Sequence, residues 1–332
     1  LDTNGTITTI AGSSIGGFSG DGGLAILANL NKPWGIDIDG SGNIYIADSG
    51  NHRIRKIDTN STITTIAGSD TPGFSGDGGL AATALLDNPK DIKIDTAGRI
   101  YIADSGNHRI RRIDLNGTIT TIAGSGAIGA GNGNISGDGG LSTTAKFDAP
   151  QGLVVDGLGN LYVADSNNHR IRRIDVNGTI TTIAGSGAVG NGNGGFSGDG
   201  GLSSSARLNQ PTSVAVDGKG RLYIADGGNH RVRLISSATG NYRAVASNAY
   251  GNATSNNAKL TIGYAPTQIM QTPDINGTFG NTITLKSNAM GSEPLICQWQ
   301  KDGINIPGAN SPNLLLSDLN QTHEGTYRML IS

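Results

Sequence analysis

IADSGNHRIRKID (residues 46–58) is the first of four copies of one motif in this chain. The motif returns as IADSGNHRIRRID at 102–114, VADSNNHRIRRID at 163–175 and, with more substitutions, IADGGNHRVRLIS at 224–236. A proline marks an equivalent point ahead of each copy, with spacings of 56, 61 and 61 residues between Pro33, Pro89, Pro150 and Pro211. A repeat of this length indicates an architecture built from similar structural units packed side by side.

Each repeat contains four short β segments. In the first repeat they are GIDID (35–39), NIYIAD (43–48), HRIRKI (52–57) and TITTIAG (62–68). Glycine-rich turns separate these segments and β-branched residues fill them, as expected for strands. Four strands per repeat predict a β-propeller blade. Ile54 and Ile57 fall on opposite faces of the third segment, which suits a blade packed between two neighbours.

The sequence NHRIR after YIADSGN resembles the NHL repeat, a β-propeller family, and the TTIAG and SGDGG segments are similar to its bacterial members. The resemblance implies an all-β fold, with a four-bladed NHL-type propeller at residues 1–240. Two ways of completing the fourth blade are open. TITTIAG at 6–12 can supply its last strand and close a four-bladed ring. Alternatively 241–247 supplies this strand, and the blades form an open arc of a larger ring. NHL propellers usually have more than four blades, which favours this alternative.

The repeated aspartates and histidines are predicted to be structural. Four identical sets point in different directions, whereas a catalytic site needs one convergent set. We expect each Asp to cap the backbone donors of the following turn and each His and Arg to pair with a carboxylate there. A metal site shared by the histidines is not expected, because the third strands lie too far apart. The residues are Asp48, His52, Asp104, His108, Asp165, His169, Asp226 and His230.

An SGDGG loop precedes each blade and carries Asp21, Asp77, Asp138 or Asp199. We expect these loops at the rim of the propeller, with each Asp capping a short helix in which Leu24, Leu27 and Leu30 face the blade. The alternative is a calcium loop, but one carboxylate per copy falls short of the six or more oxygens that calcium prefers. Copies three and four lengthen this loop by five residues.

Positions at the start of the innermost strand differ between copies and are the candidates for ligand binding. They are predicted to lie at the mouth of the central channel, on the face that carries the SGDGG loops. Neutral drift of these positions is the competing interpretation. The candidates are Trp34, Lys90, Asp91, Gln151 and Thr212.

The C-terminal third departs from the repeat. Residues 241–263 resemble the last two strands of a bacterial immunoglobulin-like domain, and can instead complete the fourth blade. Residues 264–332 resemble an immunoglobulin-like domain truncated before its last strand. Trp299 matches the buried core tryptophan of that fold, and Gly325-Thr326-Tyr327 matches its tyrosine corner. The single cysteine, Cys297, is predicted to be a structural thiol.

Composition excludes some classes of function. The chain has 24 basic and 26 acidic residues, which predicts no nucleic-acid partner, and no stretch is apolar enough for membrane insertion. We expect no cofactor and no enzyme activity, but a secreted or cell-surface interaction module that binds a protein or carbohydrate. The alternative is a metal-dependent propeller lyase or lactonase, which would need acidic or histidine side chains converging on the channel. The channel positions Asp37, Lys90, Asp91 and Lys93 include no histidine or glutamate.

Overall fold

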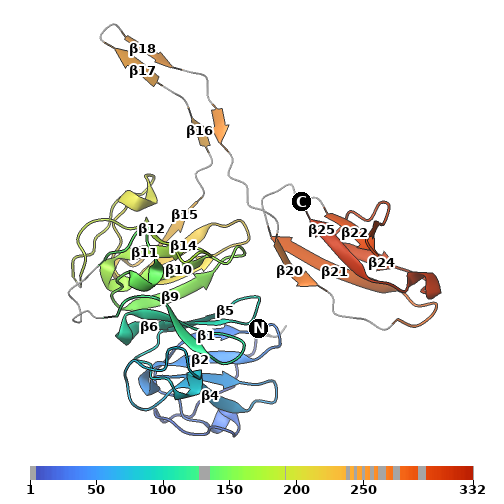
Figure 1. Ribbon diagram of the computed structural model, residues 1–332, viewed down its shortest axis with the longest axis horizontal. Helices are drawn as coiled ribbons and strands as arrows, with labels where there is room; N and C mark the ends of the chain where they lie inside the picture. Colours follow the sequence, from blue (N-terminus) through green and yellow to red (C-terminus); the bar gives the residue numbers. More distant parts are fainter. Residues whose placement is uncertain are drawn as a thin grey trace. The chain divides into compact units, whose positions relative to one another are not determined.

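The computed structural model describes residues 5–126, 135–190, 192–236, 240–242, 245–248, 251–254, 258–260, 267–271, 277–290 and 297–331. The chain divides into two compact units (Figure 1). The first comprises Leu1–Ala215 and Tyr223–Leu234, and the second Val216–Leu222 and Ile235–Ser332. No helix among the described residues is long and apolar enough to cross a membrane.

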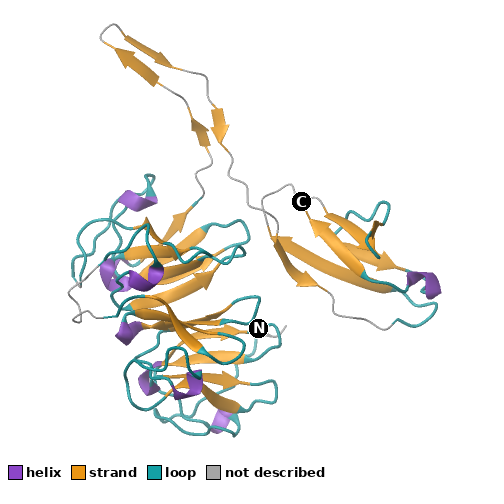
Figure 2. Cartoon of the chain, viewed as in Figure 1, coloured by secondary structure: helices purple, strands orange, loops and turns teal. Residues whose placement is uncertain are grey.

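The predicted blades are confirmed. Three antiparallel sheets have four strands each in chain order, and the fourth sheet has three (Figures 1 and 2). The first holds β1 (Pro33–Ile38), β2 (Ile44–Asp48), β3 (Arg53–Ile57) and β4 (Ile63–Gly68). The second holds β5 (Asp91–Ile94), β6 (Ile100–Asp104), β7 (Arg109–Ile113) and β8 (Ile119–Ala123). The third holds β9 (Pro150–Val155), β10 (Leu161–Asp165), β11 (Arg170–Ile174) and β12 (Ile180–Ala184). The fourth holds β13 (Pro211–Val216), β14 (Leu222–Asp226) and β15 (Arg231–Ile235).

Helical structure in the propeller is limited to 3₁₀ turns of three residues. One set follows the second strand of each blade, as η2 (Ser49–Asn51), η4 (Ser105–Asn107), η6 (Ser166–Asn168) and η8 (Gly227–Asn229). The other set lies in the segments between blades, as η1 (Ala25–Leu27), η3 (Ala81–Thr83), η5 (Ser142–Thr144) and η7 (Ser203–Ser205).

The hydrophobic core lies between successive blades. One cluster joins Ala47 and Ile54 of the first blade to Leu86, Ile92 and Ile102 of the second, and all five are fully buried. Burying an isoleucine side chain stabilises the fold by roughly 1.5–3 kcal/mol. Each blade therefore gains its stability from its neighbours, which explains why the strands are apolar on both faces.

The segment before each blade packs differently from the prediction. The expected helix is a single 3₁₀ turn, in which Ala25 and Ala28 face the sheet and are buried while Leu24 and Leu27 are exposed. Small side chains are needed here because the segment approaches itself closely. A Cβ at Gly20 would lie 2.7 Å from the Cα of Ala28, and Gly20 also has φ +86°. The predicted inward leucine face is therefore wrong for Leu24 and Leu27, whereas Leu30 is partly buried and packs against the core.

Neither predicted closure of the fourth blade is present among the described residues. β15 is the last strand of its sheet, and residues 7–12 form no strand. Downstream, β16 (Gly240–Tyr242) pairs with β19 (Ala258–Leu260), and β17 (Val245–Asn248) pairs with β18 (Gly251–Thr254). The strands at 241–247 thus pair within their own segment.

The C-terminal region forms two three-stranded sheets. One holds β20 (Thr267–Gln271), β21 (Ile283–Met290) and β24 (Asn313–Leu316), and the other β22 (Cys297–Lys301), β23 (Ile304–Asn305) and β25 (Tyr327–Ile331), with η9 (Gln321–His323) before β25. Trp299 is buried against Cys297 and Met329, and the Tyr327 hydroxyl donates to the His323 carbonyl at 2.8 Å. The assignment of an immunoglobulin-like domain remains a prediction, as do the domain boundaries.

Candidate functional site

A buried arginine on the third strand organises each blade. In the second blade, Arg111 is fully buried, and its guanidinium lies 3.3 Å from the Asp104 carboxylate and 2.8 Å from that of Asp77. The same guanidinium donates to the carbonyls of Ser75 at 3.0 Å and Leu85 at 3.5 Å. Arg111 therefore ties the second strand and the SGDGG segment to the third strand, and we call this arrangement the arginine clamp.

The clamp recurs in all four blades. Its arginines are Arg55, Arg111, Arg172 and Arg233. The other SGDGG carboxylates lie 2.7, 2.9 and 2.6 Å from them, at Asp21, Asp138 and Asp199. The other strand-two carboxylates lie 3.3, 3.5 and 3.4 Å away, at Asp48, Asp165 and Asp226. A phenylalanine ring lies against each clamp arginine: Phe18, Phe74 and Phe196 at 4.8, 4.8 and 4.9 Å in the first, second and fourth blades, and Phe147 at 5.4 Å in the third.

This geometry corrects the predicted role of the SGDGG aspartates. The N-cap residue of η1 is Leu24, and no side chain caps this turn. Asp21 instead accepts from Arg55. A carboxylate already paired with a guanidinium is a poor ligand for a calcium ion, which needs several free oxygens.

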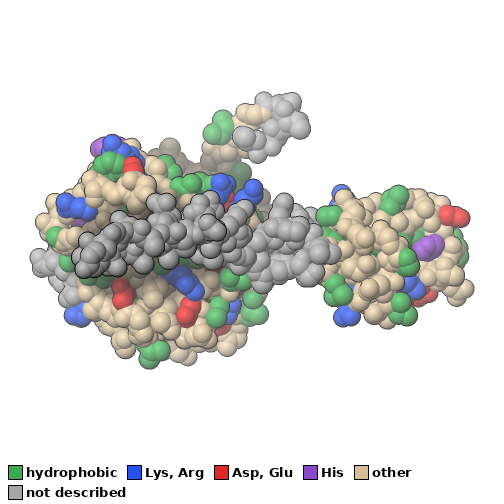
Figure 3. All heavy atoms as spheres, turned by 90° about the horizontal axis from the view of Figure 1, so that it is seen from above, with side chains coloured by type: hydrophobic (Ala, Val, Ile, Leu, Met, Phe, Trp, Pro, Cys, Tyr) green, Lys and Arg blue, Asp and Glu red, His purple; other side chains and the backbone are tan. Residues whose placement is uncertain are grey.

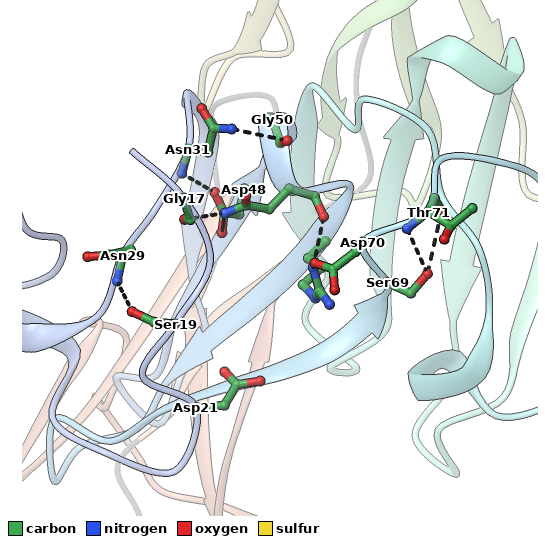
Figure 4. Close-up of polar contacts among 12 residues, drawn as sticks. Gly17, Ser19, Asp21, Asn29, Asn31, Asp48, Gly50, Ser69, Asp70 and Thr71 are labelled. Atoms are coloured by element: carbon green, nitrogen blue, oxygen red, sulfur yellow. Dashed lines mark hydrogen bonds and ion pairs between the residues drawn. The ribbon is translucent and has the colours of Figure 1, made fainter. Parts of the chain in front are cut away.

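The strand-two aspartates also differ from the prediction. Asp48 does not cap the turn that follows it. Its carboxylate accepts from the backbone amide of Asn31 and the side chain of Asn51, both at 2.7 Å, so it fixes the segment that enters the blade (Figure 4). Burial raises the pKa of Asp104 to about 6 and that of Asp165 to about 7.

The histidines connect neighbouring blades rather than pairing with the aspartate of their own turn. Nδ1 of His52 accepts the backbone amide of Asn88 at 3.0 Å, and Nδ1 of His108 accepts that of Ala149 at 3.1 Å. His169 makes the same contact with Gln210 at 3.0 Å. The residues that donate precede the marker prolines and have left-handed φ angles of 48°, 49° and 46°. Each histidine therefore satisfies a strained backbone donor of the next blade.

The predicted mouth positions and the SGDGG turns lie toward opposite ends of the blade. Pro33 pairs with Asp48, where β2 finishes. The Gly22 amide donates to the Ile63 carbonyl at 2.8 Å, and Ile63 pairs with Ile57 at the other end of the sheet. The prediction of one shared face is therefore wrong, because the connecting segment runs along the sheet before it enters the first strand.

Trp34 and Lys90 come together near the starts of β1 and β5. The Lys90 ammonium lies 4.0 Å from the centre of the Trp34 ring, within the range of a cation–π contact. Trp34 is 58% exposed. Burial, and then the charge of Lys32, lowers the pKa of Lys90. Gln151 and Thr212 are half-buried, and no hydrogen bond or ring contact in the described chain joins them to this pair.

Asp91 belongs to the interior of the propeller. Its carboxylate accepts the backbone amides of Leu153 at 2.8 Å and Ile92 at 2.9 Å, and so joins the inner strands of two blades. A Cβ at Gly35 would lie 2.6 Å from the Cα of Asp91, so this position differs between copies for a packing reason. Asp37 makes a similar bond to the amide of Ile94 at 2.8 Å. We therefore leave Asp91 out of the proposed binding surface.

The structure offers no arrangement that resembles a metal centre in its described residues, where no three His, Cys, Asp or Glu side chains cluster. Charged side chains of both signs are scattered over the face seen in Figure 3. The polar contacts of the propeller are concentrated in the arginine clamps, whose strand-two carboxylates are fully buried and whose SGDGG carboxylates are partly exposed.

Sequence reasoning missed the clamp arginine and its aromatic neighbour. It assigned the cationic contacts to the turn, at Arg53, and gave no role to Phe18. The usable signal was that Arg55 and Asp21 recur together in all four copies, although 34 residues separate them. Two charges of opposite sign that recur together across repeats indicate contact within one blade.

These contacts define a propeller module of repeated, arginine-clamped blades, and comparison with known proteins identifies its type. Residues 16–75 and 71–132 match the family model of the Teneurin NHL domain, and residues 147–174 and 208–233 match that of the NHL repeat. The chain therefore belongs, over residues 16–233, to the NHL-repeat β-propellers.

The chain is also similar to individual known proteins. Human Teneurin-1 is 34% identical over 235 residues, which cover 65% of this chain and 8% of the relative. The protein SUPPRESSOR OF QUENCHING 1, chloroplastic, of Arabidopsis thaliana is 36% identical over 40% of this chain and 13% of its own length. Among solved structures, an auxiliary nutrient binding protein from Bacteroides ovatus aligns with a TM-score of 0.46 and 24% identity over 63% of this chain and 49% of that one. The chain spans only about 8% of the length of the teneurins that it matches.

Proposed function

We propose that this propeller is a non-catalytic interaction module of an extracellular or cell-surface protein, and that it binds a protein or glycan at the channel mouth. The observation that carries the proposal is the Trp34–Lys90 pair. An indole that is more than half exposed and stands on β1, which pairs with β2, is a preformed contact surface. The likeness to teneurin NHL domains supports the same class of function.

The pair suits a ligand with both an apolar face and polar groups. Tryptophan contributes a large, rigid area to interfaces at a small entropic cost. Lys90 covers one side of the ring at 4.0 Å, and its ammonium can donate to carboxylate or hydroxyl oxygens. The burial that lowers the pKa of Lys90 also weakens its hydration, so a ligand that pairs with it loses less solvation.

The test is a glycan array and a pull-down with the propeller-containing chain, followed by titration of each hit. Trp34→Ala and Lys90→Ala should each weaken binding about tenfold or more, equivalent to about 1.4 kcal/mol. The matched control is Leu115→Ala, which removes another exposed apolar side chain far from the marker prolines in sequence. Equal binding by all three variants would place the ligand elsewhere. A stoichiometric transition metal in the purified protein would instead favour the lyase or lactonase alternative.

A further inference from the structure

Each four-stranded blade buries two polar atoms that have no hydrogen-bond partner among the described residues. One is Nε of the clamp arginine, and the other is the hydroxyl oxygen of a threonine on the fourth strand. The arginines are Arg55, Arg111 and Arg172, and the threonines are Thr65, Thr121 and Thr182. The same two atoms are thus left over in three successive blades, so they belong to the design of the repeat.

The two atoms lie on neighbouring strands and on one face of the sheet. Arg111 of β7 is the direct partner of Thr121 of β8 in the antiparallel ladder. Side chains of directly opposite residues point to the same face, with their Cβ atoms about 4.5–5.5 Å apart. The equivalent pairs are Arg55 with Thr65 in the first blade and Arg172 with Thr182 in the third. No direct hydrogen bond joins Nε to the hydroxyl group in these described pairs.

The other nitrogens of the clamp guanidinium are fully used. In the second blade, Nη1 of Arg111 donates to the Asp104 carboxylate at 3.3 Å and to the Leu85 carbonyl at 3.5 Å. Nη2 donates to the Ser75 carbonyl at 3.0 Å and lies 2.8 Å from the Asp77 carboxylate. Of the five N–H donors of an arginine, only the one on Nε is left. A buried donor without an acceptor destabilises a fold, so three of them call for a partner.

The surroundings of the pair decide which kind of molecule joins the two atoms. The guanidinium of Arg111 already faces two carboxylates, at Asp104 and Asp77. An anion would be repelled by these carboxylates, and a cation would be repelled by the guanidinium. The carbonyls of Ser75 and Leu85, which accept from the same guanidinium, belong to the segment that covers this face of the sheet. The partner is therefore neutral and small, and it both accepts and donates a hydrogen bond.

We infer that each four-stranded blade binds one internal water molecule between its clamp arginine and the paired threonine. The water oxygen accepts the Nε–H of the arginine, and one of its protons is donated to the threonine oxygen. Buried waters are typically held by two to four polar groups, and this pair supplies two of them. The three sites are Arg55–Thr65, Arg111–Thr121 and Arg172–Thr182.

The water extends the clamp to the outermost strand. Nη1 and Nη2 connect the third strand to the second strand and to the SGDGG segment. The water on Nε adds the fourth strand, so one guanidinium links three parts of the blade to the strand that carries it. A lysine has a single nitrogen at the end of its side chain and cannot donate in these separate directions. The inference thus explains why the clamp residue is arginine in each copy.

Oxygen-17 magnetic relaxation dispersion, which counts long-lived internal waters, tests the inference on the full 332-residue chain. Thr121→Val keeps the branched shape of the side chain and removes the hydroxyl group, so the count should fall by one water. The triple variant that also carries Thr65→Val and Thr182→Val should lose three. Thr120→Val is the matched control, because Thr120 is the neighbouring residue of β8 and pairs with Arg112 on the other face. An unchanged count in the triple variant, or an equal loss in the control, overturns the inference.

Thermal melts of the same variants distinguish a bridged pair from an unsatisfied one. If a water joins the pair, Thr121→Val removes one of its two partners and leaves Nε of Arg111 unpaired, so the melting temperature should fall. If the hydroxyl group has no partner at all, replacing it by a methyl group removes a buried unsatisfied polar atom, and the melting temperature should rise. A rise for Thr121→Val relative to Thr120→Val overturns the inference.

A crystal structure of the chain, with and without a bromide soak, locates the molecule itself. The expected result is a density peak within about 3.2 Å of both Nε and the hydroxyl oxygen in each four-stranded blade. A direct hydrogen bond of about 2.9 Å between these two atoms would overturn the inference. An anomalous bromide signal at the peak would also overturn it, because the site would then hold an anion.

Discussion

The arginine clamp yields a sharp prediction for the substitution Arg111→Met. Methionine keeps the length and the apolar contacts of the side chain but removes the guanidinium. Asp104, which is fully buried, then loses its countercharge at 3.3 Å, and Asp77 loses its partner at 2.8 Å. The carbonyls of Ser75 and Leu85 also lose their donor.

The unpaired carboxylate of the buried Asp104 accounts for most of the expected loss of stability. Breaking a buried ion pair by removing one partner typically costs roughly 3–5 kcal/mol. Asp104 keeps the amide of Asp87 and the side chain of Asn107, both at 2.8 Å, and it can take up a proton because burial raises its pKa to about 6. We therefore expect the lower end, about 3 kcal/mol, or a melting temperature lower by about 6–12 °C for a domain of this size.

Thermal melts and urea titrations at about pH 7.5 and pH 5 measure this effect. The loss should be smaller at the lower pH, where the proton on Asp104 replaces the missing countercharge. The control is Arg112→Met on the same strand, because Arg112 pairs with Asp114 at 2.8 Å where both side chains are partly exposed. Such a pair contributes about 0–1 kcal/mol. If the Arg111→Met variant has the same melting temperature as the wild type, or if the control loses as much stability, the clamp does not stabilise the blade as argued.

Three further predictions follow from single contacts. His108→Ala leaves the Ala149 amide, which donates across 3.1 Å, without its acceptor and should lower the free energy of unfolding by roughly 1–3 kcal/mol in urea titrations. Gly124 has φ +94°, and a new Cβ there would lie 2.5 Å from the His108 carbonyl oxygen, whereas Gly78 has φ +81° with nothing within 4 Å. Gly124→Ala should therefore lower the melting temperature far more than Gly78→Ala, and equal calorimetric shifts would contradict this. Burial raises the pKa of Asp165 from 3.8 to about 7, so its stabilising contribution is complete below about pH 4 and is lost as the pH rises through about 7. In urea titrations across that range, Asp165→Asn should flatten the dependence of the free energy of unfolding on pH. An unchanged dependence would refute the assignment.

The blades were predictable from sequence because their information is local and repeated. Four strands per period, glycine turns and apolar residues on both faces determine each sheet, and the predicted segment at 52–57 differs from β3 by one residue at its start. The segment between blades was harder to predict. The spacing of Leu24, Leu27 and Leu30 suggested a helix, but the chain makes one 3₁₀ turn and buries Ala25 and Ala28, because the segment approaches itself closely between Gly20 and Ala28.

The roles of the polar residues were less predictable, because a repeat hides which copy a contact reaches. His52 stands next to Arg53 in sequence, yet its ring accepts an amide from the following blade at Asn88. Asp21 precedes Arg55 by 34 residues and contacts it within the same blade. Repetition makes both contacts look alike in the sequence, since every copy contains every partner.

The ends of the arc resolve this ambiguity, because only there does a contact lose its partner. At the start of the chain the SGDGG carboxylate of Asp21 is still paired with Arg55, so the clamp belongs to one blade. At the other end His230 is exposed while His169 is buried, so the histidine contact belongs to two blades. The terminal copies therefore separate the contacts that fold a blade from those that join blades. The second class can be satisfied by any neighbouring blade of this type, because each partner is part of the repeat.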